Sequence, residues 1–345
     1  MAALYLFVLA IQLMKLGAAP IGARLQDTPL IQNAVSTLGF GWMGANVILS
    51  GSPVAIVALQ FFSANVLTPL QTFTMITGSR LGASFVVLLV GFLFAIRNKD
   101  KKRTIGMGVL AVSMSAIVYI PAMFLGYAIL KSGVLSGVRL EASKEVSDLI
   151  DVVWGPVLNA LRGMSFLSGP LMFILGLLVM LLAFKLLDRV LPELDGEKHA
   201  ASRIHWLKRP WPMFALGLLA ALLTLSVSVA LTILIPLAAK GYINRREAIP
   251  YIMGANITTL ADTLLVAMLM NNAEAVQIVL ATGIAVTIFT LIYLVFLYKP
   301  ITKAVISLDD WVVGTSQRTW LFVGSLFLVP VVLFVVGNVV QNTIG

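Results

Sequence analysis

The chain has 345 residues, of which 59% are hydrophobic and only 11% are charged. Ordinary soluble domains carry about 25% charged residues, so this composition, with a mean hydropathy of +0.99, excludes a soluble globular protein and indicates an integral membrane protein. The net charge of +9 is then expected to come from cytoplasmic loops and not from a nucleic-acid partner. There is no cysteine, and the only histidines, His199 and His205, share one charged loop, so disulfides and thiolate chemistry are excluded and a histidine-based metal or catalytic centre is disfavoured.

Long uncharged windows predict where the chain crosses the membrane, since a helix needs about 20 apolar residues to span the hydrocarbon. Residues 28–96 contain one charged residue, Arg80, but prolines, glycines and polar residues interrupt them. We therefore expect several short, broken segments there, which are tolerated at membrane depth only where protein or a water-filled cavity satisfies the backbone. Further windows free of Asp, Glu, Lys and Arg, each long enough to span, cover residues 104–130, 163–184, 211–239, 275–298 and 319–345.

The charges between these windows predict the orientation of the chain. Residues 97–103 hold five basic residues against one Asp, which places them in the cytoplasm. Residues 139–151 hold two basic and four acidic residues and lie one span away, so we expect them outside. Residues 185–209, with six basic and four acidic residues, return to the cytoplasm, and Lys299 and Lys303 are expected there as well.

An internal repeat links two polar motifs that lie far apart in the sequence. Ser50 and Ser52 occur in LSGSPVA, and Ser226 and Ser228 occur in LSVSVAL, each pair at the end of an apolar run. A second motif follows each pair, TGSRLGAS in the first copy and MGANITTL in the second. The serine pair and the second motif are separated by the same distance in both copies, so the two units superimpose at an offset of 176 residues.

The repeat extends upstream, because LFVLAIQLM from Leu6 is similar to MFILGLLVM from Met172 at an offset of 166 residues. The span at roughly 81–96 ends at the cytoplasmic Arg97, whereas its counterpart at roughly 257–270 must end outside for the next span to reach Lys299 inside. The two copies are therefore expected to have opposite topology. Inverted repeats that enclose broken helices near the bilayer midplane are typical of secondary transporters.

These observations predict an all-α integral membrane protein with inverted-topology repeats and two re-entrant or broken-helix hairpins. The expected organisation is a first repeat with its following span at 1–131, an extracytoplasmic linker at 132–162, a second repeat with its following span at 163–298, and a loop with a C-terminal transmembrane helix at 299–345.

The motifs resemble those of the sodium-phosphate cotransporters of the type II class and their bacterial relatives. That family carries a repeated Gln-Ser-Ser-Ser-Ala-Thr followed by a repeated Gly-Ala-Asn-Ile-Gly-Thr-Thr. Here GANITT at residues 254–259 matches the second element, and LFVLAIQLMKLG resembles the opening helix of the family. The resemblance covers roughly residues 3–97 and 170–270. It implies a secondary active transporter of a small oxyanion, with inorganic phosphate as the expected substrate, sodium as the coupling ion and alternating access as the mechanism.

The sequence also departs from the family pattern. The family glutamine is replaced by leucine in both copies, the middle serine by glycine or valine, and the first asparagine by arginine; the residues are Leu49, Leu225, Gly51, Val227 and Arg80. The ion stoichiometry of the family therefore does not follow from the resemblance.

Ten polar residues are candidates for binding the substrate or ions. In the family, the matching elements form re-entrant hairpins that bind phosphate and sodium. Hydroxyl oxygens suit a hard cation or donate to phosphate, although serines in membrane helices also bond to carbonyls or permit close packing. The candidates are Ser50, Ser52, Arg80, Ser84, Ser226, Ser228, Asn256, Thr258, Thr259 and Asp262, with a sodium ion expected near Ser226, Ser228, Asn256 and Thr259.

Two features of the second motif have alternative interpretations. Asn256, Thr258 and Thr259 follow Gly254 at the start of an expected helix, where free N–H groups favour an anion. The same residues could simply cap that helix. Asp262 could ligate a cation, carry a proton or pair with Arg80.

Arg80 is a functional candidate because a charge inside the membrane is costly unless it faces a partner or a cavity. Its planar guanidinium suits an oxyanion, and its charge could equally stand in for that of a sodium ion. The structural alternative is a salt bridge to Asp262, the only charged residue between Glu247 and Glu274.

Other classes of function remain as alternatives. A sodium-independent or proton-coupled carrier of another anion and a non-transporting membrane scaffold both fit the sequence. An enzyme is not expected, since no HExxH, Gly-x-Ser-x-Gly or P-loop sequence occurs. No cofactor is expected apart from sodium as a coupling ion. The expected partners are phosphate or a similar anion, sodium and the lipid of a plasma or inner membrane, with a homo-oligomer left open.

Overall fold

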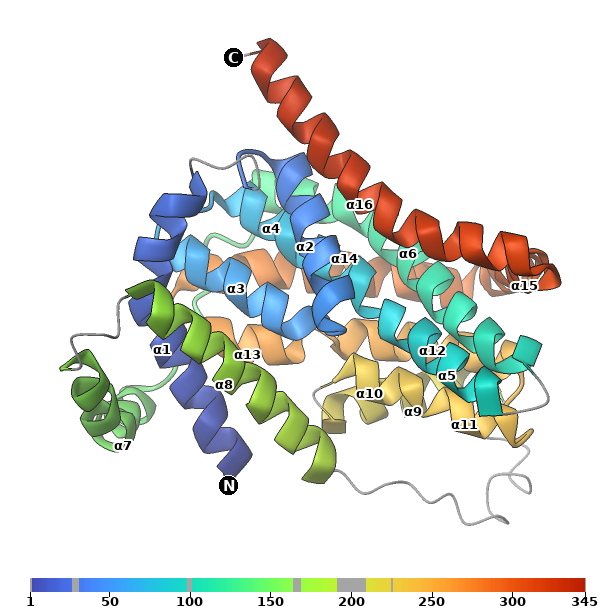
Figure 1. Ribbon diagram of the computed structural model, residues 1–345, viewed down its shortest axis with the longest axis horizontal. Helices are drawn as coiled ribbons and strands as arrows, with labels where there is room; N and C mark the ends of the chain where they lie inside the picture. The colour runs from blue at the N-terminus through green and yellow to red at the C-terminus, as the bar shows by residue number, and fades with distance from the viewer. Residues whose placement is uncertain are drawn as a thin grey trace.

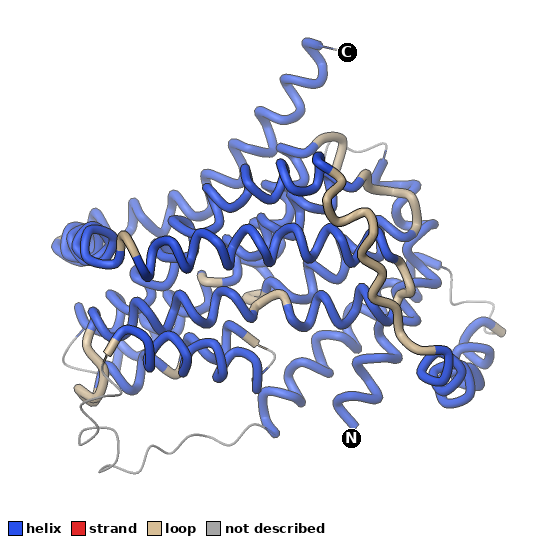
Figure 2. Tube along the Cα trace, turned by 180° about the vertical axis from the view of Figure 1, so that it is seen from behind, coloured by secondary structure: helices blue, strands red, loops and turns tan. Residues whose placement is uncertain are grey.

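The computed structural model describes residues 2–26, 31–97, 101–163, 169–190, 209–224 and 226–344. Within these ranges every regular element is an α-helix (Figures 1 and 2), so the all-α class predicted from the sequence is confirmed. The loop with His199 and His205, residues 98–100 of the first basic segment, and Leu225 lie outside the described residues.

The helices within the described residues are numbered in chain order. They are α1 (Ala2–Gln26), α2 (Ala34–Ile48), α3 (Gly51–Ser63), α4 (Pro69–Ala83), α5 (Phe85–Arg97), α6 (Lys101–Ser132), α7 (Lys144–Arg162), α8 (Gly169–Val190), α9 (Pro210–Thr224), α10 (Val227–Thr232), α11 (Leu234–Ala239), α12 (Arg245–Thr258), α13 (Ala261–Leu269), α14 (Ala273–Val295), α15 (Tyr298–Gly314) and α16 (Ser316–Ile344).

Seven stretches of the described chain are long and apolar enough to cross a membrane, as expected for a multi-pass membrane protein. Two of them are composite, because 69–96 joins α4 to α5 and 245–269 joins α12 to α13. The others cover residues 3–21, 102–132, 169–186, 273–295 and 316–337.

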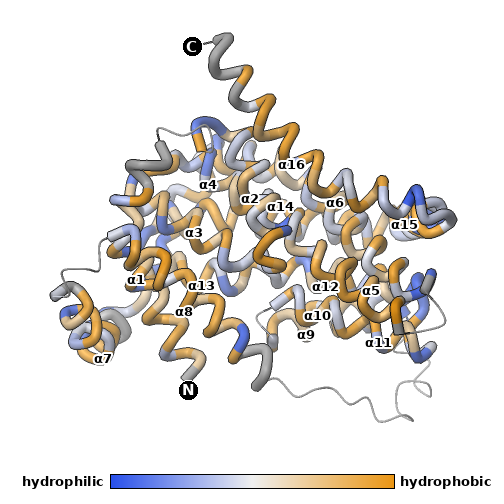
Figure 3. Tube along the Cα trace, viewed as in Figure 1, coloured by the Kyte–Doolittle hydropathy of each residue, from blue (hydrophilic) through white to orange (hydrophobic). Residues whose placement is uncertain are grey.

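The long helices α6, α14 and α16 run along the bundle, while α7 and α15 lie across its two opposite ends (Figure 1). Hydrophobic residues dominate most helices, and hydrophilic residues gather towards the ends, α15 among them (Figure 3). One apolar cluster is built around α1, α3 and α4 with parts of α8, α13 and α14. A second is built around α6 and α9–α12.

Three parts of the sequence prediction need correction. The second motif, expected at the start of a helix, lies instead at the end of α12, where Asn256 and Thr258 occupy the last turn and Thr259 is the C-cap. Residues 211–239, predicted as one spanning window, form the separate helices α9, α10 and α11. The segment after Tyr298, predicted as a loop, is the helix α15. Hydropathy alone does not indicate where an apolar run is broken, and it does not identify a helix that lies across the end of the bundle.

The same close contacts occur in the two halves, 176 residues apart. The helix pairs α2–α4 and α9–α12 are each packed so tightly that a side chain on a glycine of one helix would collide with a carbonyl oxygen of the other. The glycine and carbonyl pairs are Gly41 with Met75, Gly78 with Leu38, Gly217 with Tyr251, and Gly254 with Phe214.

The helix starts recur at the same spacing. Thr68 caps α4 and forms a capping box with Gln71, the Thr68 N–H donating to Oε1 of Gln71 over 2.8 Å. Asn244 caps α12 and forms a capping box with Glu247, the Asn244 N–H donating to Oε2 of Glu247 over 2.9 Å. Such reciprocal bonds satisfy two otherwise unpaired donors at a helix start.

Helices α1 and α8, which the sequence relates at an offset of 166 residues, pack against each other in antiparallel directions. A Cβ at Gly17 would collide with Gly169, and one at Gly176 would collide with Met14. The rings of Phe7 and Phe184 meet edge to face with centroids 5.6 Å apart.

Candidate functional site

Both serine pairs lie where a helix is interrupted. Helix α2 ends before Leu49, whose φ of 60° is left-handed, a conformation uncommon for a residue other than glycine. Ser50 then begins α3, and its hydroxyl makes no capping hydrogen bond. In the second half Ser226 begins α10, and its Oγ accepts a hydrogen bond from the N–H of Val229 at 3.3 Å.

The two interruptions face one cavity of about 330 Å³. Ser50 lines it from the first half, and Ser226 and Ser228 line it from the second. Lys185, on α8, brings a positive charge to the same cavity. The cavity thus combines hydroxyl groups that accept or donate hydrogen bonds with a cation, which is a combination suited to a small oxyanion.

Arg80 forms a second, deeper cluster. The residue is only 3% exposed. Its Nη1 donates to the Ser52 Oγ at 3.3 Å and to the Thr259 Oγ1 at 3.0 Å, and its Nη2 donates to the hydroxyl of Thr263. One guanidinium therefore holds together the first serine pair and the end of the second motif.

Asp262 is the acidic partner in this cluster. Its Oδ1 lies 3.6 Å from Nη2 of Arg80 and accepts hydrogen bonds from the N–H and the hydroxyl of Thr263, at 2.6 and 3.0 Å. The Thr263 hydroxyl therefore accepts a hydrogen bond from Arg80 and donates one to Asp262. Within the described part of the chain, the Asp262 Oδ2 and the Arg80 Nε are buried without a hydrogen-bond partner. Buried polar atoms are usually hydrogen-bonded, so two unpaired atoms within one cluster are unusual.

Asn256 contacts α6 and not Arg80. Its Oδ1 accepts a hydrogen bond from the Ser115 Oγ at 3.4 Å, and its backbone carbonyl accepts one from the Tyr119 hydroxyl at 3.1 Å. Its Nδ2 is buried and has no hydrogen-bond partner among the residues that the structure describes. The second motif is thus anchored to the middle of a spanning helix.

The other two candidates bond to helix carbonyls. The Ser84 hydroxyl donates to the Leu81 carbonyl at 3.1 Å. The Thr258 hydroxyl donates to the Leu218 carbonyl at 3.2 Å, and the residue lines a separate, mainly apolar cavity of about 360 Å³ beside α14. Neither residue joins the Arg80 cluster or the cavity at the helix breaks.

The four residues expected near sodium fall into different surroundings. Ser226 and Ser228 line the cavity, Thr259 contacts Arg80, and Asn256 contacts α6. No hydrogen bond among the described residues joins these four side chains.

Sequence reasoning missed several residues that the fold places beside the candidates. Thr263 lies four residues after Thr259, one helical turn away, and that spacing was a usable signal. Ser115 and Tyr119 form another such pair inside an apolar window. Lys185 had no signal, because it lies at the start of a charged segment and was interpreted as a loop charge.

The geometry is that of a multi-pass membrane protein whose broken helices surround buried polar groups. A comparison with family models finds that residues 179–309 match the model described as Na+/Pi-cotransporter. This stretch runs from α8 into α15, and the match supports membership of the sodium-phosphate cotransporter family, as the motifs predicted. Neither the curated proteins nor the solved structures contain a match to this chain.

Proposed function

We propose that the protein is a secondary active transporter of a small oxyanion, with inorganic phosphate as its substrate. The observation that carries the proposal is the cavity of about 330 Å³ at which both helix breaks meet, lined by Ser50, Ser226, Ser228 and Lys185. Hydroxyl donors orient the oxyanion, and the ammonium group supplies a compact charge without demanding a fixed geometry. The family match lies over the half that contributes two of these serines.

Alternating access in this proposal uses two repeats of opposite orientation. The recurrence of the glycine contacts and capping boxes at 176 residues, together with the antiparallel packing of α1 and α8, supports it. The short helices α3, α10 and α11 are then the re-entrant parts of the two hairpins. Exchange of conformation between such halves opens a central site first to one side and then to the other.

A labelling experiment tests this topology, and because the chain has no native cysteine, only the introduced thiols can react. Asn98→Cys and Glu274→Cys are introduced separately and exposed to a membrane-impermeant thiol reagent in sealed vesicles. The proposal expects labelling from opposite sides. Labelling of both positions from one side would refute the inverted arrangement.

The proposal includes sodium coupling, with the guanidinium of Arg80 in the place of one sodium ion. Nη1 of Arg80 lies between the hydroxyls of Ser52 and Thr259, two hard oxygen ligands of the kind that a sodium ion needs. A fixed guanidinium there repels a nearby cation, since charges interact strongly where the dielectric is low. We therefore expect fewer coupling ions than an uncharged residue at position 80 would permit.

Proton coupling is the second scheme, and the buried, unpartnered Oδ2 of Asp262 favours it. Uptake of radiolabelled phosphate into proteoliposomes separates the schemes. A sodium gradient alone, a pH gradient alone and no gradient are compared. Acceleration by sodium supports the first scheme, and acceleration only by the pH gradient supports the second.

The binding cavity has its own test. The double variant Ser50→Ala with Ser228→Ala removes two hydroxyls that line the cavity without taking part in capping. Uptake should fall at least about tenfold, since a hydrogen bond to a charged group contributes roughly 1.5–3 kcal/mol. Ser325→Ala is the control, because that hydroxyl bonds within its own helix. Equal uptake by the double variant and the control would refute the site.

A further inference from the structure

Helix α15 lies outside the transport site and connects two spanning helices, α14 and α16. One stripe of this helix is buried: Thr302, Val305, Asp309 and Val312 recur at intervals of three and four residues. The opposite face is exposed and includes Lys299, Lys303 and Trp311. This pattern is typical of a helix that lies in the interface between membrane and water.

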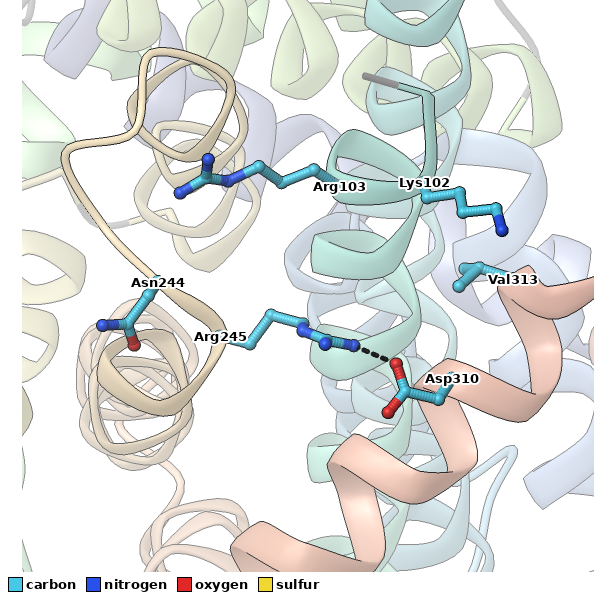
Figure 4. A pocket seen from close by; sticks show the side chains of 6 residues that line it. All are labelled: Lys102, Arg103, Asn244, Arg245, Asp310 and Val313. Atoms are coloured by element: carbon cyan, nitrogen blue, oxygen red, sulfur yellow. Dashed lines mark hydrogen bonds and ion pairs between the residues drawn. The ribbon is translucent and has the colours of Figure 1, made fainter.

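The acidic groups of α15 are already bound to α12. Figure 4 shows Arg245 reaching across to Asp310. Nη1 of Arg245 lies 2.8 Å from Oδ2 of Asp309 and 2.5 Å from Oδ1 of Asp310. Both carboxylates are therefore paired with one arginine, which balances one of their two negative charges. The cleft drawn in Figure 4, of about 340 Å³, also contains Arg103, whose Nη2 donates to the Ile243 carbonyl at 3.4 Å.

A larger cleft, of about 580 Å³, lies nearer the start of α15, and Asp310 lines both clefts. Three cationic side chains, from Arg246, Lys299 and Lys303, line it. None of the three forms a salt bridge within the part of the chain that the structure describes. The Tyr298 hydroxyl helps to form one wall, because it donates to the Arg246 carbonyl at 3.1 Å. The cleft thus presents a positive charge that its own acidic neighbour, Asp310, does not balance.

The surroundings of this cleft are apolar. It opens where spanning helix α14 ends, and Val295 and Phe296 at that end are 52% and 75% exposed. Higher on the same helix, Leu291 and Ile292 are also exposed, and Ile306 lines the cleft itself. The cations therefore lie at the end of an exposed apolar surface of the kind that acyl chains cover. Lysine and arginine stems cover such surfaces while their charged ends remain in the headgroup layer.

We propose that the cleft between Arg246, the end of α14 and α15 binds the phosphate group of an anionic phospholipid, with its acyl chains along α14. The three cations recognise the anionic oxygens of a phosphate diester, and free inorganic phosphate presents oxygens of the same kind. The continuous apolar surface selects the lipid. Each basic residue near a membrane surface strengthens attraction to anionic lipid, so three together hold one headgroup against exchange. This site is distinct from the cavity at the helix breaks.

Native mass spectrometry of the full-length protein in detergent tests the proposal, with phosphatidylglycerol and phosphatidylcholine supplied at equal concentrations. The protein should retain phosphatidylglycerol in preference to the neutral lipid. The triple variant Arg246→Gln, Lys299→Gln and Lys303→Gln should retain at least about tenfold less of it. The matched control Lys131→Gln, Arg139→Gln and Lys144→Gln removes three exposed cations elsewhere and should retain as much as the native protein.

A competition arm distinguishes the two sources of phosphate. Millimolar inorganic phosphate should leave the bound phosphatidylglycerol in place. Complete displacement would show a free-anion site and overturn the lipid assignment, as would equal retention by the two triple variants. Thermal unfolding of each variant in the same detergent confirms that the compared proteins are folded. This test does not depend on the proposed transport function, because the retained lipid is measured in detergent, where no ion gradient exists.

Discussion

The two halves of the molecule share their scaffold but differ at its centre. The glycine contacts and the capping boxes recur at a spacing of 176 residues, and the serines that begin α3 and α10 recur at the same spacing. Arg80 and Asn256 are also 176 residues apart, yet their surroundings differ. Arg80 contacts three hydroxyls and Asp262, whereas Asn256 contacts Ser115 and Tyr119 of α6.

This difference shows at which positions the fold restricts the choice of residue. A glycine against a neighbouring carbonyl admits no side chain, so both copies need glycine wherever two helices approach that closely. A side chain that reaches into a polar interior is restricted only by the partners it finds. The first copy has a cation with an acidic partner, and the second has a neutral amide. The charged groups therefore make the two halves chemically unequal within nearly equal scaffolds.

The largest effect is expected from breaking the Arg80 pair. Arg80→Ala leaves Asp262 as an unpaired buried charge and should cost about 3–5 kcal/mol of stability, with Asp262→Ala similar in size. Phosphate uptake should fall strongly in both. The double variant should be more stable than either single variant, because it leaves no uncompensated charge. Thermal unfolding in detergent and uptake in proteoliposomes measure these effects, and full activity of Arg80→Ala would contradict both the proposed replacement of a sodium ion by Arg80 and its ion-pair role.

Arg80→Asn gives position 80 the same residue as its equivalent, Asn256, and so tests whether the arginine alone makes the two copies differ. Removal of the guanidinium frees the hydroxyls of Ser52 and Thr259 and leaves the Asp262 carboxylate to attract a cation. Sodium should therefore raise the unfolding temperature of this variant more than choline does, and more than it raises that of the native protein. Uptake should gain a steeper sodium dependence. Asn256→Ala is the comparison variant, since it changes the equivalent position without removing a charge.

Sequence patterns predicted the parts of this architecture that depend on local composition or short spacing. The all-helical membrane class and the broken segments before residue 96 followed from hydropathy and from the scarcity of charges, which also left a salt bridge to Asp262 as one of the alternative interpretations of Arg80. The repeat led us to expect one central site formed by both serine pairs, whereas the separation of the cavity at Ser50 and Ser228 from the Arg80 cluster could be seen only in the fold. The role of Lys185 was equally hidden, since it depends on which helix packs beside the serine breaks.

Close packing of the equivalent helix pairs gives the next largest effect. Gly78→Ala places a methyl group against the Leu38 carbonyl, and Gly254→Ala places one against the Phe214 carbonyl. Each change should cost roughly 1–3 kcal/mol, the range for overpacking, and the two costs should be similar. Gly324→Ala is the control, since nothing lies within 4 Å of its new methyl group. A loss of stability in only one of the two variants, measured by thermal unfolding, would show that the matching contacts differ in energy.

The smallest effect is expected at the end of the bundle, where Arg245→Ala removes the partner of Asp309. The Asp309 side chain is 1% exposed, and burial raises its pKa, while its hydrogen bond and charge interaction with Arg245 oppose the rise. Loss of Arg245 should raise that pKa further and cost roughly 2 kcal/mol or less, because the arginine side chain is 37% exposed and screened by solvent.

The sign of the pH dependence at Asp309 follows from this raised pKa. A carboxyl group whose pKa is higher in the folded state favours folding when it is protonated, and this contribution is lost as the pH rises through the folded-state pKa. The difference in unfolding temperature between Arg245→Ala and the native protein should therefore be smaller at acidic than at alkaline pH. Adding Asp309→Asn to the variant should abolish the dependence, since an amide does not titrate. A pH-dependent difference that persists in the double variant would assign it to another group, with Asp310 the nearest carboxylate, and would remove Asp309 from the explanation.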